Sequence, residues 1–307
     1  MEVVVHSVGN SFPVKKLMKV YCNSALDRFG RPCAKGANPL RLALFVSMLS
    51  LGVAWSAMVM RSAEAGTIFV SGDSNIANYL TGSVFGSVVA GNQTLFQNLL
   101  QGGTAVGVLE STSGASSANV ADVDISNFYN SVPQVSSTLI SGAVTHQTLL
   151  GVDLFVSLLP DDPFGESEIT VLRDFLADSG SVFFLGENSH SLFSDANDNI
   201  NAALMDLGSG IAIVPDTFDS YAEAVGSQIA TDPFTSGVGS FHYSVASQIT
   251  GGTPLFFGSG QQPFLAYAIA TVPEPSTLLL IALSLLGLAG RSFWRKGCKI
   301  RRRDQTD

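Results

Sequence analysis

The amino-acid sequence predicts an α/β fold in which a mostly parallel sheet is covered by helices on both faces. Between residues 66 and 271, short and nearly continuous apolar runs alternate with segments of helical periodicity, an order typical of parallel sheets. A segment of about 200 residues is also long enough to bury a substantial core. The three cysteines, Cys22, Cys33 and Cys298, lie outside it. We therefore expect one domain without disulfides, Cys-ligated zinc or a Cys nucleophile.

The first half of this domain is expected to supply two strands and one well-defined helix. Residues 67–71 are apolar and end at Gly72, as a buried strand does. Asn92 is expected to cap a helix that places Leu95, Phe96 and Leu99 on one face. The elements expected here are strands over 67–71 and 105–109, a helix from Asn92 to Gly102, a Ser-rich loop over 111–121 and a helical region over 126–140 that Pro133 interrupts.

The second half repeats the alternation more regularly. Ile169, Leu172 and Leu176 recur at helical spacing, and Gly180 marks the end of their helix. Asp195 is expected to cap the next helix. The elements expected here are strands over 152–158 and 181–185, helices over 166–179 and 195–207, and short β segments over 211–214, 241–245, 254–257 and 264–268.

Three polar turns follow the predicted strands. In an open α/β sheet, ligands bind beyond the carboxyl ends of the strands, at the point where the strand order reverses. We therefore expect these turns to form a candidate pocket. Its residues are Asp73, Ser74 and Asn75 in the first turn, Asp161 and Asp162 in the second, and Glu187, Asn188 and His190 in the third.

The run over 153–188 resembles the third strand, helix and fourth strand of the class I glutamine-amidotransferase-like fold, and residues 67–213 follow the same order. This resemblance implies a flavodoxin-like sheet with a nucleophile elbow after Leu185. Catalytic members place Cys at that elbow, whereas this chain has Glu187 or Asn188 there. Amide hydrolysis by a thiolate is therefore excluded. The resemblance implies a non-catalytic relative that keeps the fold as a binding module.

A secreted serine hydrolase is the alternative function. Residues 68–74 resemble the first block of the GDS-type serine hydrolases, in which the position of Ser74 supplies the nucleophile. Those enzymes activate it with a late Asp-x-x-His pair, which this chain lacks. Glu187-x-x-His190 is its acid–histidine pair at that spacing, so a Ser74, His190, Glu187 relay requires the two turns to meet. The competing interpretation is that Asp73 or Ser74 caps the following helix.

The sequence predicts no cofactor and no metal site. The acidic run that begins at Asp195 has Asp206 eleven residues later, as a calcium loop has a terminal acid. Such a loop needs Gly at its sixth position, where this chain has Ile200. Helix capping by Asp195 is therefore the favoured interpretation.

The C-terminal segment, residues 272–307, has three dissimilar parts in a fixed order. The first part is the motif Val272-Pro273-Glu274-Pro275-Ser276-Thr277, which we expect to be extended because its prolines fix φ. An apolar segment over 278–294 is expected to be a short transmembrane helix, and the tail over 291–303 contains seven cations that favour the cytoplasmic side. This layout resembles the PEP-CTERM signal of bacterial surface proteins, which implies exosortase as the processing partner. An ordinary C-terminal anchor is the alternative.

The N-terminal segment also predicts export. A basic extension over 1–41 precedes an expected signal peptide over 42–65. Ala63 and Ala65 have the small-x-small spacing of a signal cleavage site, which makes Gly66 the expected first residue of the mature chain. Because Arg61 interrupts the approach to that site, an uncleaved N-terminal anchor is the alternative.

Charge is divided sharply along the chain. Residues 66–271 contain 19 Asp and Glu but only Arg173 as a cation, a net charge of −18, while the whole chain is −9. An acidic surface repels phosphate backbones, so nucleic-acid binding is excluded. Exopolysaccharide and divalent cations remain as candidate ligands, with a solvated exterior as the favoured interpretation of the acidity.

The sequence therefore predicts a protein that is exported across the inner membrane by the secretion machinery. It would be anchored by its C-terminal helix, processed by exosortase and released to the cell surface or the extracellular matrix. Its acidic α/β domain would be a non-catalytic binding module.

Overall fold

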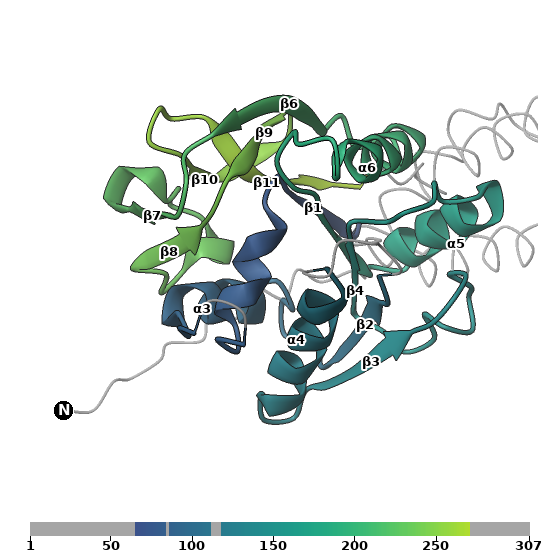
Figure 1. Ribbon diagram of the computed structural model, residues 1–307. Coiled ribbons are helices and arrows are strands. Elements are labelled where there is room, and N and C mark those ends of the chain that lie inside the picture. Colours follow the sequence, from purple (N-terminus) through teal and green to yellow (C-terminus); the bar gives the residue numbers. More distant parts are fainter. Residues whose placement is uncertain (1–64, 84–85, 112–117, 271–307) are drawn as a thin grey trace, which may run out of the picture. The chain divides into compact units, whose positions relative to one another are not determined.

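A computed structural model describes residues 65–83, 86–111 and 118–270 (Figure 1). The expected signal peptide except Ala65, and the C-terminal motif, helix and tail, lie outside these residues. The described part is built on one seven-stranded sheet and two short ribbons. The sheet contains β1 (Thr67–Ser71), β2 (Ala105–Leu109), β3 (Ser136–Ile140), β4 (Leu154–Leu158), β5 (Ser181–Leu185), β10 (Thr253–Phe257) and β11 (Pro263–Ile269).

Strands follow the order β10-β11-β1-β5-β4-β2-β3 across the sheet. Five adjacent strands, β1, β5, β4, β2 and β3, run parallel to one another. The antiparallel strands β11 and β10 extend the sheet beyond β1. The mostly parallel α/β sheet predicted from sequence is confirmed. Its order differs from the flavodoxin-like 2-1-3-4-5, because the first strand of the chain lies beyond the fifth. The crossover from β1 to β2 therefore spans two strands that enter the sheet later.

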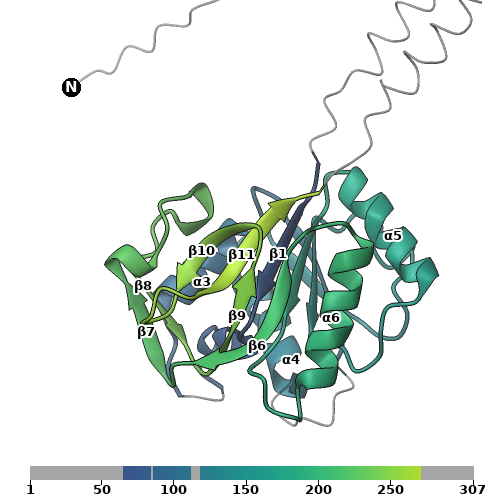
Figure 2. The ribbon, with the colours of Figure 1, turned by 90° about the horizontal axis from the view of Figure 1, so that it is seen from above.

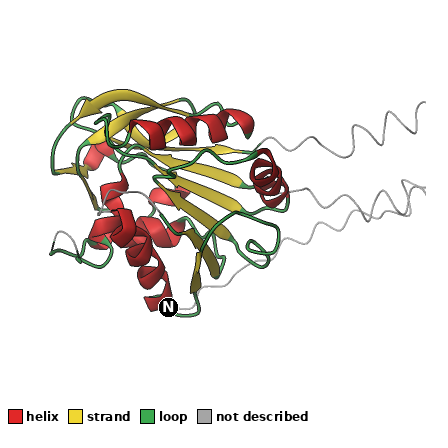
Figure 3. Cartoon of the chain, turned by 45° about the vertical axis from the view of Figure 1, so that its right-hand side comes forward, coloured by secondary structure: helices red, strands yellow, loops and turns green. Residues whose placement is uncertain are grey.

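Helices cover both faces of the sheet, as predicted (Figure 3). Alternate residues of each strand point to opposite faces, so Phe69 of β1 joins one core while its neighbours Ile68 and Val70 join the other. The first core is completed by η1 (Ser74–Tyr79), α3 (Ala90–Asn98) and α4 (Ala118–Ser131), and the second core by α5 (Glu166–Ala177) and α6 (Ser194–Asp206).

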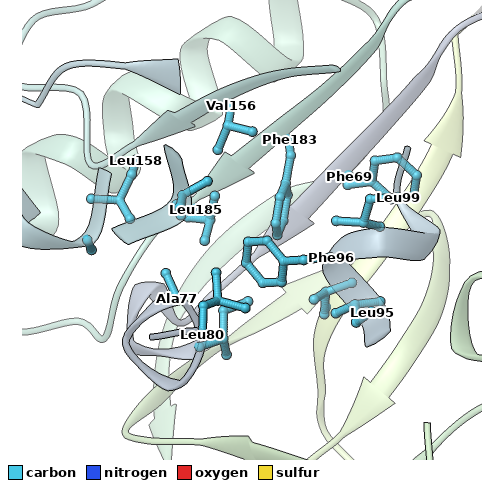
Figure 4. Close-up of a cluster of buried hydrophobic side chains, with 14 of the residues drawn as sticks. Phe69, Ala77, Leu80, Leu95, Phe96, Leu99, Val156, Leu158, Phe183 and Leu185 are labelled. Atoms are coloured by element: carbon cyan, nitrogen blue, oxygen red, sulfur yellow. The ribbon is translucent and has the colours of Figure 1, made fainter. Parts of the chain in front are cut away.

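Aromatic rings anchor α3 against the sheet in the first core (Figure 4). Phe96 of α3 meets Phe183 of β5 edge to face, with ring centroids 5.6 Å apart, and Phe183 meets Phe69 of β1 at 6.3 Å. All three side chains are fully buried. Such edge contacts contribute about 0.5–1.5 kcal/mol each beyond the area they bury. These edge-to-face contacts hold α3 against the sheet at β5 and β1.

The C-terminal third of the described chain forms two antiparallel ribbons beside the sheet. β6 (Ala212–Phe218) pairs with β9 (Ala246–Thr250), and β7 (Ala222–Val225) pairs with β8 (Ser240–Tyr243). Figure 2 shows the β7–β8 ribbon on the β10 side of the sheet, where Ala230 donates to the backbone of Leu255 at 2.9 Å. The β segments predicted near β6, β8, β10 and β11 are confirmed, whereas β7 and β9 were not predicted.

The expected helical region over 126–140 is confirmed up to Ser131 and wrong beyond it. The structure has α4 ending at Ser131, a turn at Pro133, and β3 from Ser136. Pro133 is thus a boundary between a helix and a strand, since proline cannot continue the helix. The Ser-rich loop expected over 111–121 is shorter than predicted, because α4 begins at Ala118.

Two predicted helix caps are also wrong. The N-cap of α3 is Val89 and that of α6 is Phe193, so Asn92 and Asp195 both lie inside their helices. Asp195 is exposed in the first turn, where a carboxylate interacts favourably with the helix dipole. Asn92 is fully buried and binds a strand instead.

Four asparagines on helices each bind both backbone polar groups of one distant residue. Asn92 of α3 donates to the carbonyl of His242 at 2.8 Å and accepts from its N–H at 2.9 Å. The amide thereby occupies the position of a neighbouring strand and satisfies backbone groups that would otherwise be unpaired. The same arrangement joins Asn130 to Ser137, Asn197 to Glu187, and Asn201 to Ile213.

Replacing Asn92 with Ala should destabilise the domain strongly. The side chain makes three buried hydrogen bonds, to both polar groups of His242 and to the carbonyl of Ile76. We expect a loss of about 2–4 kcal/mol in the free energy of unfolding, measured by urea denaturation of residues 66–270. Gln97→Ala on the exposed face of the same helix is the control and should change it by less than about 0.5 kcal/mol. Equal effects of the two substitutions would contradict this role for Asn92.

Candidate functional site

The carboxyl ends of β1 and β5 form the point where the connections leave the sheet in opposite directions. These strands are adjacent and parallel. The chain leaves β1 toward η1 and α3 on the first core, and leaves β5 toward α6 on the second. This is the topological switch point at which α/β sheets bind ligands. Two of the three predicted polar turns meet there.

Asp73 connects the first of these turns to a distant ribbon. It is fully buried and caps η1 by accepting from the N–H of Asn75 at 2.8 Å. Its other carboxylate oxygen accepts from the N–H of Ser244 at 2.6 Å. The expectation that Asp73 caps the following helix is confirmed, with η1 as a 3-10 helix.

Glu187 is the centre of the site. It is 2 % exposed, and its two carboxylate oxygens receive four hydrogen bonds. One oxygen contacts Ser74 Oγ at 2.5 Å and Asn75 Nδ2 at 2.9 Å. The other accepts from the backbone N–H of Asn188 at 3.1 Å and from its Nδ2 at 2.9 Å. Four contacts fill the acceptor capacity of a carboxylate, so the two turns are joined through this one side chain.

Glycine is required where the turns leave the strands. A Cβ on Gly186 would lie 2.5 Å from Asn197 Oδ1, the atom that accepts from the N–H of Glu187. A Cβ on Gly72 would lie 2.0 Å from the backbone oxygen of Ser247. Both positions therefore depend on the close backbone approach that only glycine permits.

The two carboxyls have raised pKa values. Burial is the main cause for both: it raises the pKa of Asp73 to about 6, against hydrogen bonds from Ser244 and Asn75 that lower it. Burial raises the pKa of Glu187 to about 8, and the charge of Asp73 adds to this rise, while donors from Ser74 and Asn188 oppose it. Glu187 thus holds a proton at neutral pH.

The position of that proton follows from the chemistry of the four contacts. Three of the donors to Glu187 are amide nitrogens of Asn75 and Asn188, which cannot accept a hydrogen bond. The hydroxyl of Ser74 can accept one. The protonated carboxyl therefore donates to Ser74 Oγ across the 2.5 Å contact, and Ser74 donates to Glu187 only when the carboxyl is ionised.

The remaining predicted pocket residues, His190, Asp161 and Asp162, are exposed. His190 is exposed, its N–H donates to Asn188 Oδ1, and its Nδ1 accepts from the N–H of Leu192. The two turns meet through the direct contact of Ser74 with Glu187, whereas the hydrogen bonds of His190 go to Asn188 and Leu192 and not to the Ser74–Glu187 pair that the alternative relay requires. Asp161 and Asp162 are exposed in the turn after β4, which Asn199 of α6 ties down through the backbone oxygens of Pro160 and Asp161.

Sequence reasoning missed the residues that close the site. Ser244, between β8 and β9, donates to Asp73, and Ser247 donates from its N–H to the carbonyl of Gly72 at 2.8 Å. Asn197 of α6 binds both backbone groups of Glu187. Ser244 and Ser247 are more than 170 residues from Asp73 and Gly72 in sequence, and no local pattern signals such pairing. The backbone of Ser244 and Ser247 thus lies against the turn after β1, at the switch point.

This arrangement supports proton storage better than cation binding. The N–H groups of Asn75 and Asn188 point hydrogen atoms at the oxygens of Glu187, where a cation would need free lone pairs. Within residues 65–83, 86–111 and 118–270, no three His, Cys, Asp or Glu side chains are grouped to hold a metal ion. In the same residues, no helix is both long and apolar enough to cross a membrane.

Comparison with known proteins identifies the C-terminal segment. Residues 271–296 match the family model described as the PEP-CTERM protein-sorting motif. The chain therefore carries the signal of an exported protein that exosortase processes and sorts to the cell surface. No curated protein matches the sequence. A solved structure titled "mmIFT52 N-terminal domain" aligns with 45 % of this chain and with 76 % of its own chain, at 18 % sequence identity. The TM-score of 0.36 is too low to infer a shared fold.

The free energy of unfolding of the domain should fall as the pH rises from the unfolded to the folded pKa values of Asp73 and Glu187. Glu187 has an ordinary pKa of 4.5 when unfolded and about 8 when folded, and Asp73 shifts in the same direction, from 3.8 to about 6. The folded state then binds more protons than the unfolded state between about pH 4 and pH 8, so raising the pH favours unfolding.

Urea denaturation of residues 66–270 from pH 5 to pH 8.5 measures this dependence. We expect Glu187→Gln to remove a pH-dependent loss on the order of 3 kcal/mol, because glutamine does not titrate. Glu166→Gln, an exposed carboxyl at the start of α5, is the matched control and should keep the wild-type slope. Parallel pH profiles for wild type and Glu187→Gln would contradict the raised pKa.

Proposed function

We propose that this protein works at the cell surface as a non-catalytic binding module after export and exosortase processing. The observation that carries the proposal is the PEP-CTERM match over residues 271–296, which supplies the route and the processing partner. The domain composition supports it, since an acidic chain without cysteines between residues 66 and 271 suits an exported, soluble exterior. The motif Val272 to Thr277 is the segment that exosortase would recognise.

The α/β domain belongs, in this proposal, with the glutamine-amidotransferase-like domains that have lost catalysis. The turn after β5 supports this, because Gly186 makes the tight exit expected of an elbow and Glu187 follows it. Glu187 is buried and fully hydrogen-bonded, as a structural residue is, whereas a nucleophile must be exposed to substrate. The envelope or its exopolysaccharide is the proposed partner.

The competing function is a secreted serine hydrolase that uses Ser74. One observation favours it, the 2.5 Å contact between Ser74 Oγ and a carboxyl of raised pKa. Two features oppose it. Ser74 is only 7 % exposed, and the raised pKa of Glu187 disfavours the ionised form that would accept a proton from the hydroxyl. Activity through this pair would require pH above about 8.

Processing at the C-terminal motif is tested by mass spectrometry of surface material from the native host. We expect no peptides beyond Thr277 in that material, and we expect the Pro273→Ala, Pro275→Ala double variant to stay full-length in the membrane fraction, because the extended motif is lost. Gln305→Ala, in the tail beyond the motif match, is the matched control and should be processed normally. Surface protein with intact peptides reaching Arg303 would instead indicate a plain anchor.

Catalysis by Ser74 is tested with purified residues 66–271 and p-nitrophenyl esters between pH 6 and pH 9.5. The proposal expects no turnover above the uncatalysed rate for wild type and the same result for Ser74→Ala. Turnover that rises above pH 8 in the wild type and is lost in Ser74→Ala would establish the hydrolase.

A further inference from the structure

A hollow away from the switch point combines aromatic rings with neutral polar side chains. It lies between the carboxyl end of α3, the 3-10 helix η3 (Pro233–Thr235) and β11, and encloses about 540 Å³. Small-molecule sites in proteins span about 300–1,000 Å³ and join apolar walls to a few polar groups. Size and lining therefore qualify this hollow as a binding site.

Two half-buried aromatic rings form its apolar wall. Phe234 and Tyr267 both line the hollow, with ring centroids 4.9 Å apart at 71°. Phe234 rests edge to face on the fully buried Phe69 at 4.8 Å. Its backbone is also fixed, because Asp232 accepts from its N–H and Asn98 donates to its carbonyl. The wall is thus rigid before any ligand arrives, which reduces the entropy lost on binding.

The polar groups of the hollow are mostly acceptors. The amide nitrogens of Asn98 and Gln101 already donate to protein acceptors. Asn98 donates to the carbonyls of Phe234 and Ser236, and Gln101 donates to the hydroxyls of Ser181 and Thr67. Their amide oxygens are left to accept from a ligand. Asp232 receives the Tyr267 hydroxyl at 3.1 Å on one oxygen. Gln97 is exposed at the rim and offers both a donor and an acceptor.

Charge restricts the class of ligand. Among the residues that the structure describes, no Lys or Arg lines the hollow, and Asp232 is the one charged side chain there. The domain around it has a net charge of −18 over residues 66–271. A phosphate, sulfate or uronate would therefore be repelled, whereas a ligand rich in neutral hydroxyl donors suits the acceptors.

A second hollow of about 530 Å³ adjoins the first and shares Asp232 and Pro233 with it. Together the two adjoining hollows extend over a longer surface than a single sugar ring would fill. We propose that they bind a neutral oligosaccharide, with the C–H face of one sugar ring on Tyr267, the edge of the same sugar against Phe234, and its hydroxyls on Asn98, Gln101 and Asp232. This proposal rests on the proposed function and assigns its ligand a place on the domain.

The experiment uses the full-length protein in micelles of a zwitterionic detergent without sugar head groups. Maltotetraose, cellotetraose and N-acetylchitotetraose serve as neutral probes, and tetragalacturonic acid as the anionic counterpart. Saturation-transfer NMR detects binding and calorimetry measures Kd. We expect at least one neutral probe to bind and tetragalacturonic acid to show no signal.

Variants then locate the site. Tyr267→Leu removes the ring but keeps apolar packing and should weaken binding about tenfold or more, about 1.4 kcal/mol. Gln97→Ala changes only an exposed side chain and should weaken it about threefold. Gln147→Ala, exposed on a loop of the other face, is the matched control and should leave Kd unchanged.

Two results would overturn the proposal. One is the absence of any signal from all neutral probes at millimolar concentration. The other is binding that neither Tyr267→Leu nor Gln97→Ala weakens. Either result leaves export and sorting intact, because those are measured separately by the peptides recovered beyond Thr277.

Discussion

The buried carboxyl of Glu187 is the interaction on which the arrangement of β1, β5 and the adjoining ribbons depends. Its four hydrogen bonds join the turn after β1 to the turn after β5, and Asp73 extends the network to Ser244 beyond β8. Burying two neighbouring carboxyls without a cation is costly, and protonation of one of them lowers that cost. The switch point that would form a ligand crevice in a related fold here holds the domain together.

Hydrogen bonds from neutral asparagine side chains connect distant parts of the domain, a role that ion pairs have in other proteins. The described residues contain one cation other than histidine, Arg173, and the ion pairs among them are His146–Asp174 and His242–Glu223, both partly exposed and so weakly stabilising. Four asparagines instead satisfy both backbone groups of residues at strand ends and edges. An acidic exterior and a neutral hydrogen-bonded interior are thereby compatible in one exported domain.

The parts of the fold that sequence predicts are those with local causes. The central strands β1, β4 and β5 are buried on both faces, so each appears in the sequence as a continuous apolar run. β3 is a Ser-rich edge strand, and its alternation of polar and apolar residues is weak. Asp73, Ser74, Asn75, Glu187 and Asn188 were predicted together because each follows a buried strand. Asn197 and Ser244 were not, because their roles depend on pairing between distant segments. The spacing of His190 from Glu187 allowed an alternative relay, but the hydrogen bonds of His190 go to Asn188 and Leu192 instead.

The C-terminal motif carries the sorting signal, and the hydrogen bonds of Glu187 join the two turns of the domain. The proposed ligand site is the separate hollow beside Phe234 and Tyr267. The central claim is that Glu187 is a buried structural residue that holds a proton. An NMR titration of the Glu187 carboxyl carbon in residues 66–270 tests this most directly. The account predicts a midpoint near pH 8. A midpoint near the ordinary value of 4.5 would show a solvated carboxylate and contradict it.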